Sequence, residues 1–107
     1  MQFLVIARTA EETPMEQVLP FVKPEAEKVW EYYAADMIRS IHYIADMSGA
    51  VLLFEAASLE AVQEAVAQLP MAQASVLQFE ILPLKPYTGL DALFANRSTK
   101  ENESNRM

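Results

Sequence analysis

The chain has 107 residues, of which 52% are hydrophobic, and its formal net charge is −7. This length suits one domain with a real core, and the acidic balance argues against nucleic acid or an anionic membrane surface as a partner. The chain has no cysteine and one histidine. This composition excludes disulfides and thiolate metal sites, makes a structural zinc site improbable, and suits a cytoplasmic protein without a bound metal.

The first residues predict neither a signal peptide nor a membrane anchor. Residues 1–6 lack a charged n-region, and their apolar run is too short for a secretory signal. No segment approaches the roughly 18 apolar residues of a membrane span. We therefore expect a small soluble globular protein with no membrane contact.

The first half of the chain predicts a strand, a helical turn and a long helix. Residues 3–7 form a short apolar run typical of a strand. Residues 13–16 have the form of a capping box with proline at the first helical position, and an irregular loop is the alternative. A longer helix is expected from near Pro24 to about Met37, with one apolar stripe at three- and four-residue steps. The stripe consists of Ala26, Val29, Trp30, Tyr33 and Met37. We expect Trp30 in the core.

Residues 38–57 read as two strands joined by a turn at residues 46–49. They contain His42, the only histidine, and Glu55, a carboxylate in the middle of a strand pattern. Polar groups inside strands cost free energy unless they are solvated, paired or used. These two side chains are therefore the first candidates for function.

The remaining elements complete a recognisable order. Ser58 is the expected N-cap of a second helix that ends at Pro70, and residues 76–84 alternate like a final strand. The order β-α-β-β-α-β predicts an α+β, ferredoxin-like domain over residues 1–95, an antiparallel sheet with two helices on one face. Residues 85–95 form a turn-rich arm whose apolar cluster, Leu90, Leu93 and Phe94, needs a surface. Residues 96–107 are polar and aperiodic, which predicts a disordered tail.

The hairpin register predicts which side chains share the face that the helices leave open. A symmetric loop at residues 46–49 sets His42 opposite Leu53 and Ser40 opposite Glu55, with Arg39 on the helix-covered face. The expected open face is apolar with polar residues in it. Its apolar members are Phe3, Val5, Val51, Leu53, Val76 and Leu82, and its polar members are Ser40, His42, Glu55, Gln78 and Glu80. Soluble monomers rarely expose such a surface. We therefore expect a second copy to cover it, giving a barrel-like homodimer with one pocket per subunit.

The segment from Ala26 to Pro70 carries a family resemblance. Its parts are the first helix leading into Ile38-Arg39-Ser40-Ile41-His42-Tyr43-Ile44-Ala45, the strand ending in Glu55, the helix after Ser58, and Leu69-Pro70-Met71. Here the chain resembles the dimeric α/β-barrel superfamily and, within it, the muconolactone isomerase family. The resemblance implies a proton shift next to a lactone carbonyl, carried out in the barrel pocket without metal or organic cofactor.

Such chemistry needs a base and a group that holds the enolate or carboxylate. His42 or Glu55 is the candidate catalytic base. The candidate substrate-binding residues are Arg39, Ser40, Gln78 and Glu80. Each of these residues also has a structural alternative. His42 could form a hydrogen bond in a dimer interface, and Glu55 could bind Ser40 or an arginine. Arg39 could cap the first helix, and Gln78 and Glu80 could lie on a solvated edge.

Three function classes remain open at this point. The first is a cofactor-independent isomerase for a small carboxylated or lactone-like molecule. The second is a non-catalytic dimeric module that binds a small apolar ligand. The third is a heme-free, monooxygenase-like enzyme acting on an aromatic substrate.

Overall fold

The computed structural model describes residues 1–10 and 12–95, so the predicted tail at residues 96–107 lies outside it. The elements are β1 (Gln2–Thr9), α1 (Met15–Val18), the 3-10 helix η1 (Leu19–Phe21), α2 (Val22–Ala34), β2 (Ile38–Tyr43), β3 (Gly49–Glu55), α3 (Leu59–Ala67), α4 (Pro70–Gln73), β4 (Leu77–Pro83) and the 3-10 helix η2 (Gly89–Phe94). The ferredoxin-like order is confirmed; α1 is the helical turn predicted near residues 13–16, and α4 is an additional short helix.

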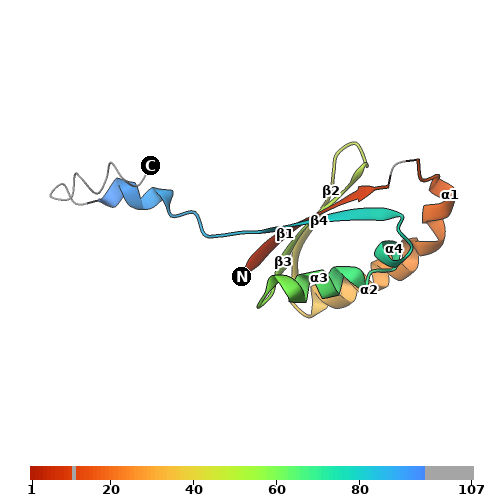
Figure 1. Cartoon of the computed structure of the whole chain (residues 1–107), viewed down its shortest axis with the longest axis horizontal. Helices are drawn as coiled ribbons and strands as arrows, with labels where there is room; N and C mark the ends of the chain where they lie inside the picture. The colour runs from red at the N-terminus through yellow and green to blue at the C-terminus, as the bar shows by residue number, and fades with distance from the viewer. Residues whose placement is uncertain (11, 96–107) are drawn as a thin grey trace.

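The four strands form one antiparallel sheet in the order β2-β3-β1-β4. Helices α2, α3 and α4 all lie on one face of this sheet, and within residues 1–10 and 12–95 no helix or strand lies on the other face (Figure 1). The core lies between the sheet and the helices, where Phe3, Val5 and Phe54 are fully buried. In the described part of the chain, no helix is long and apolar enough to cross a membrane.

Only part of the apolar stripe predicted for the first long helix faces the core: Val29 and Met37 pack against it, but Trp30 and Tyr33 are exposed. Trp30 is 64% exposed, so its predicted place in the core is wrong. The residues of this region that pack against the core are Val29, Tyr32 and Met37. Apolar and aromatic residues cover two adjacent stripes of α2, and periodicity alone does not say which stripe points inward. The stripe with Trp30 and Tyr33 faces the outer edge strand β2.

The helix ends show one confirmed cap and two departures. Ser58 caps α3, because its hydroxyl accepts a hydrogen bond from the Ala61 N–H at 3.2 Å. The capping box expected at residues 13–16 does not form: Pro14 is itself the N-cap of α1, with no side-chain cap bond. Helix α3 ends at Ala67, short of the predicted end at Pro70, and Pro70 instead begins α4. Proline tolerates this first-turn position because its missing N–H would be unpaired there anyway.

The β2–β3 hairpin turns one residue earlier than predicted. The Ile44 N–H donates to the Gly49 carbonyl at 2.8 Å, so the four-residue loop covers residues 45–48. Within the loop the Ser48 N–H donates to the Asp46 side chain at 2.9 Å, and Met47 has a φ of 63°. His42 therefore pairs with Val51, not with Leu53. From Ser40 onward this shift of two residues keeps the side chains of β2 on their predicted faces, whereas a shift of one would have exchanged the faces.

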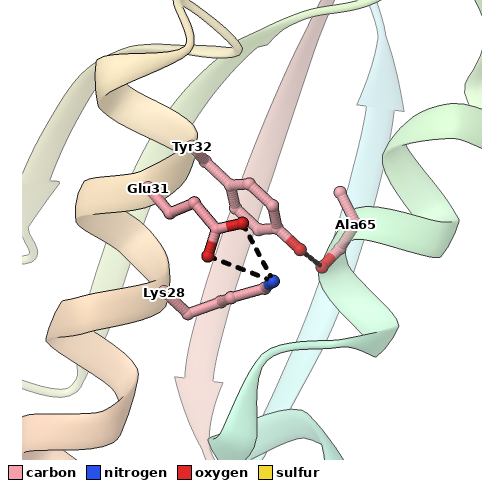
Figure 2. A network of polar contacts seen from close by, with 4 residues as sticks. All are labelled: Lys28, Glu31, Tyr32 and Ala65. Atoms are coloured by element: carbon pink, nitrogen blue, oxygen red, sulfur yellow. Dashed lines mark hydrogen bonds and ion pairs between the residues drawn. The ribbon is translucent and has the colours of Figure 1, made fainter.

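A polar network fixes α2 against α3 (Figure 2). The Tyr32 hydroxyl donates to the Ala65 carbonyl at 2.7 Å, and Lys28 pairs with Glu31 at 3.3 Å on the same side of α2. The Tyr32 ring also packs against Phe54, with 6.4 Å between the ring centroids. Burial, with a smaller contribution from nearby carboxylates, raises the pKa of Tyr32. The phenol is thus a neutral hydrogen-bond donor that joins both helices to the sheet.

Glu25 makes the corresponding tie between α2 and α4. Its Oε1 accepts a hydrogen bond from the Met71 N–H at 2.9 Å, in the first turn of α4. Burial raises the pKa of this carboxyl, and the hydrogen bond from Met71 partly opposes the rise. A helix of four residues cannot hold itself in water, so this contact helps to fix α4.

We predict that Tyr32→Phe lowers the free energy of unfolding by about 1 kcal/mol, the usual net contribution of one partly buried hydrogen bond. The ring packing against Phe54 is kept in this variant. Tyr33→Phe is the matched control, because Tyr33 is 47% exposed on the neighbouring stripe. Denaturant unfolding of both variants at one protein concentration measures the difference; equal losses would contradict the role of Tyr32.

Candidate functional site on the open sheet face

Strand pairing defines rows of side chains across the open face, and two of these rows run through all four strands. The first row is His42, Val51, Ile6 and Glu80, one residue from each strand. The second row is Ser40, Leu53, Leu4 and Leu82. Beside them, Arg8 on β1 pairs with Gln78 on β4. Directly paired residues share a face, and this face is opposite to the one that buries Val5, Leu52 and Phe54.

The centre of this face is apolar and its two edges are polar. Leu4, Ile6, Val51 and Leu53 are half-buried on the two central strands. Ser40 and His42 lie on β2, and Gln78 and Glu80 lie on β4 at the opposite edge. Three strand spacings separate the edges, about 14 Å. One chain therefore brings Ser40 and His42 together, and Gln78 and Glu80 together, but does not join the two groups.

Three apolar residues predicted for this face lie elsewhere. Phe3 and Val5 are fully buried under the helices, and Val76 is 5% exposed just before β4. Leu4 and Ile6 take the expected places of Phe3 and Val5. Residues 3–6 are all apolar, so the usual alternation that marks the buried face of a strand is absent there. The sequence pattern therefore does not say which residues of β1 face the helices.

Glu55 lies away from His42 and has a partner of its own. It pairs with Gln2 across β1, not with Ser40, and is four residues along β3 from the partner of His42. That offset is about 13 Å, so the predicted neighbourhood of His42 and Glu55 is wrong. The Met1 ammonium forms an ion pair with Glu55 and lowers the pKa of that carboxyl. A carboxylate held ionised by a cation is a weak base for carbon acids.

Arg39 does not take the position on the helix-covered face of the sheet that the predicted register gave it. The β2–β3 register shifts between Ile38 and Ser40, which marks a bulge at Arg39, and Ile38 takes the buried position at 1% exposure. Arg39 is exposed, and its Nε donates to the Asp36 carbonyl at 3.0 Å, just beyond the end of α2. This contact matches the alternative role of Arg39 at the helix end. A bulge has no reliable sequence signature here.

An open apolar cleft of about 570 Å³ lies between α2 and β2, and it is not among the sites that the sequence predicts. Trp30 and Tyr33 form one wall, with 5.9 Å between their ring centroids, and Ile41 lies opposite. The cleft also reaches Arg39, Ser40 and His42 along the edge of β2. It went unpredicted because Trp30 was assigned to the core. Among the described residues, no group of three or more His, Asp or Glu side chains could hold a metal ion.

This fold and face define a class: small ferredoxin-like proteins whose sheet is bare on one side. A family model described as muconolactone delta-isomerase matches residues 1–89, and the chain belongs to this family. No curated protein sequence gives a significant match.

Two solved structures show the same fold. One is the 5-chloro-2-hydroxyhydroquinone dehydrochlorinase from Burkholderia phenoliruptrix, in complex with 2,5-dihydroxybenzoquinone, at 18% identity and a TM-score of 0.69, covering 81% of this chain and 96% of that one. The other is a muconolactone isomerase, at 20% identity and a TM-score of 0.68, covering 83% of this chain and 93% of that one. At these identities the likeness shows the fold alone.

We predict that Glu55→Gln lowers stability near pH 7 and that this difference disappears in acid. The pKa of Glu55 is lower in the folded chain than in the unfolded one, so its contribution is present above the ordinary carboxyl pKa and is lost as the pH falls through the folded value. Chemical unfolding between pH 3 and pH 7 checks this. Glu27→Gln, at an exposed position of α2, is the control; a Glu55→Gln difference independent of pH would contradict the ion pair's role.

Proposed function

We propose that the chain is a cofactor-independent isomerase that shifts a proton next to the carbonyl of a small carboxylated or lactone-like molecule. The observation that carries the proposal is the place of His42, the only histidine, at the polar edge of an apolar strip on the uncovered sheet face. Membership of the muconolactone delta-isomerase family supports the reaction class. The dehydrochlorinase complex with 2,5-dihydroxybenzoquinone supports a small oxygenated ring as the kind of ligand.

The residues of β2 suit such a reaction. An imidazole nitrogen removes the acidic proton at one end of the unsaturated carbonyl system, and the electrons of that C–H bond form an enolate. The imidazolium then returns the proton to the carbon at the other end, so atoms, charge and oxidation state balance without a further reactant. Ser40 shares the face with His42. Its hydroxyl, two residues from His42 on β2, is a neutral donor for the enolate or carboxylate oxygen.

The pocket in this proposal lies between the open face and a second copy of the chain. The half-buried strip of Leu4, Ile6, Val51 and Leu53 is an apolar surface that water covers poorly. Two such sheets facing each other bury both strips and exclude water around His42. Exclusion of water strengthens the electrostatic interactions that hold an enolate.

The arm at residues 85–95 supports the same assembly. It leaves the end of β4 and runs away from its own domain to η2 (Figure 1). The apolar residues of η2 are exposed, with Leu90 at 58%, Leu93 at 74% and Phe94 at 84%. We infer that this arm packs on the partner subunit, where these side chains find a surface.

The cleft beside Trp30 favours one second candidate, a non-catalytic module for a small apolar ligand. Trp30 is the only tryptophan of the chain, so its fluorescence reports on this cleft directly. A ligand that changes this fluorescence but is not turned over would favour binding over catalysis.

We predict that His42→Ala lowers kcat on muconolactone by at least about a hundredfold, the usual contribution of a general base. Steady-state kinetics of the variant and the wild type measure the change, with sedimentation showing that the variant keeps its oligomeric state. Glu60→Gln, at an exposed position on α3, is the control and should keep full activity. Unchanged kcat in His42→Ala would remove His42 from the reaction.

We predict that Leu53→Glu shifts the protein toward monomer, because it places a charge in the centre of the apolar strip. Light scattering at micromolar concentration measures the mass. The control is Leu19→Glu, which adds the same charge at a residue that is 59% exposed on η1.

The triple change Leu90→Ser, Leu93→Ser and Phe94→Ser in the arm should also weaken the dimer, but less than Leu53→Glu does. Association unaffected by both changes would contradict the interface.

A further inference from the structure

The two polar edges of the open face are chemically complementary, and each is half of a site. The strand β2 carries Ser40 and His42 and contains no carboxylate over residues 38–43. The strand β4 carries Gln78 and Glu80 and contains no basic residue over residues 77–83. Within one chain, His42 and Glu80 stand at the two ends of the same row, about 14 Å apart.

Two subunits can pack with their open faces together about a twofold axis that lies between the sheets, and this axis can take two directions. We call the place where edge strands of the two subunits meet a seam. An axis parallel to the strands places β2 of one subunit beside β4 of the other at both seams. An axis across the strands places β2 beside β2 and β4 beside β4. Only the first arrangement brings a histidine and a carboxylate together at each seam, because on this face β2 carries His42 and β4 carries Glu80.

Electrostatics favours the first arrangement. The second places Glu80 beside another β4, which offers no cation, so its basic neighbour on this face is Arg8 of its own β1, diagonal to it in the next row. A carboxylate removed from water is destabilising unless partners are close, and the first arrangement gives Glu80 such a partner by adding His42 to Arg8. Rotation about an axis parallel to the strands leaves each residue at its level along the strand direction, so residues of one row stay in register with that row in the other subunit. His42 and Glu80 of the partner subunit then remain at one level of the barrel.

We propose that each pocket is completed across the subunit seam, with Ser40 and His42 from one subunit and Gln78 and Glu80 of the partner subunit. This inference rests on the proposed function, since it requires the dimer through the open face. Glu80 of the partner subunit accepts a hydrogen bond from one imidazole nitrogen of His42, which fixes the ring and its tautomer. The other nitrogen faces the substrate, which lies over the apolar rows. Glu80 is a positioning residue in this arrangement, and one chain alone does not form the site.

Introduced cysteines test the seam without any substrate, because the chain has no cysteine of its own. Ser40→Cys and Leu82→Cys occupy the ends of the second row and leave His42 and Glu80 intact. After the two variants are mixed, allowed to exchange subunits and oxidised in air with copper, we expect a disulfide-linked heterodimer on a non-reducing gel. Disulfides need Cα atoms within about 7 Å, so each variant alone should stay unlinked. Links within either variant alone, or no link in a mixture that sediments as a dimer, would overturn the inference.

Subunit mixing tests the role of Glu80. His42→Ala and Glu80→Gln are each expected to lower kcat on muconolactone at least about tenfold. In a mixed dimer one seam contains both changes and the other contains neither, so mixing should restore about a quarter of the wild-type activity. No recovery would mean that both residues act within one subunit, and would overturn the inference. Wild-type protein inactive on muconolactone would count against the proposed function, while the cysteine result would still decide the seam.

Discussion

The packing of every sheet-covering helix on one side of a four-stranded sheet is the constraint on which the rest depends (Figure 1). Alternate residues of a strand point to opposite faces, so a sheet covered on one side has half its side chains without cover. In this chain the uncovered half is apolar in the centre, with Leu4, Ile6 and Leu53 on β1 and β3. The fold therefore creates a surface that the other described residues do not cover. The role of the polar residues at its edges depends on what covers it.

The sequence predicted those parts of the fold that rest on local chemistry. Ser58 was recognised as a cap because a hydroxyl before an apolar run satisfies a free N–H of the first turn. The faces of β4 were predicted because Gln78 and Glu80 alternate with apolar residues. Local patterns failed where they were degenerate: β1 is apolar on both faces, and α2 has two apolar stripes, so Val5 and Trp30 were both placed on the wrong side.

The candidate site was only partly readable for a different reason. Pairing across the hairpin depends on where the loop closes, and a loop moved by one residue displaced Glu55 from Ser40 while leaving His42 on its predicted face. The bulge at Arg39 and the ion pair between Met1 and Glu55 depend on contacts between distant parts of the chain. No spacing along the sequence encodes these contacts. The family resemblance, by contrast, was readable from residues 26–70 and agrees with the match over residues 1–89.

The central claim is that a second copy of the chain covers the open face, and the mass of the unmodified protein in solution tests it most directly. Sedimentation equilibrium at micromolar concentration should give at least twice the chain mass of 12.0 kDa. A species of 12.0 kDa throughout that range would contradict the account. The apolar strip would then be exposed to water, and His42 would have no enclosed pocket in which to act.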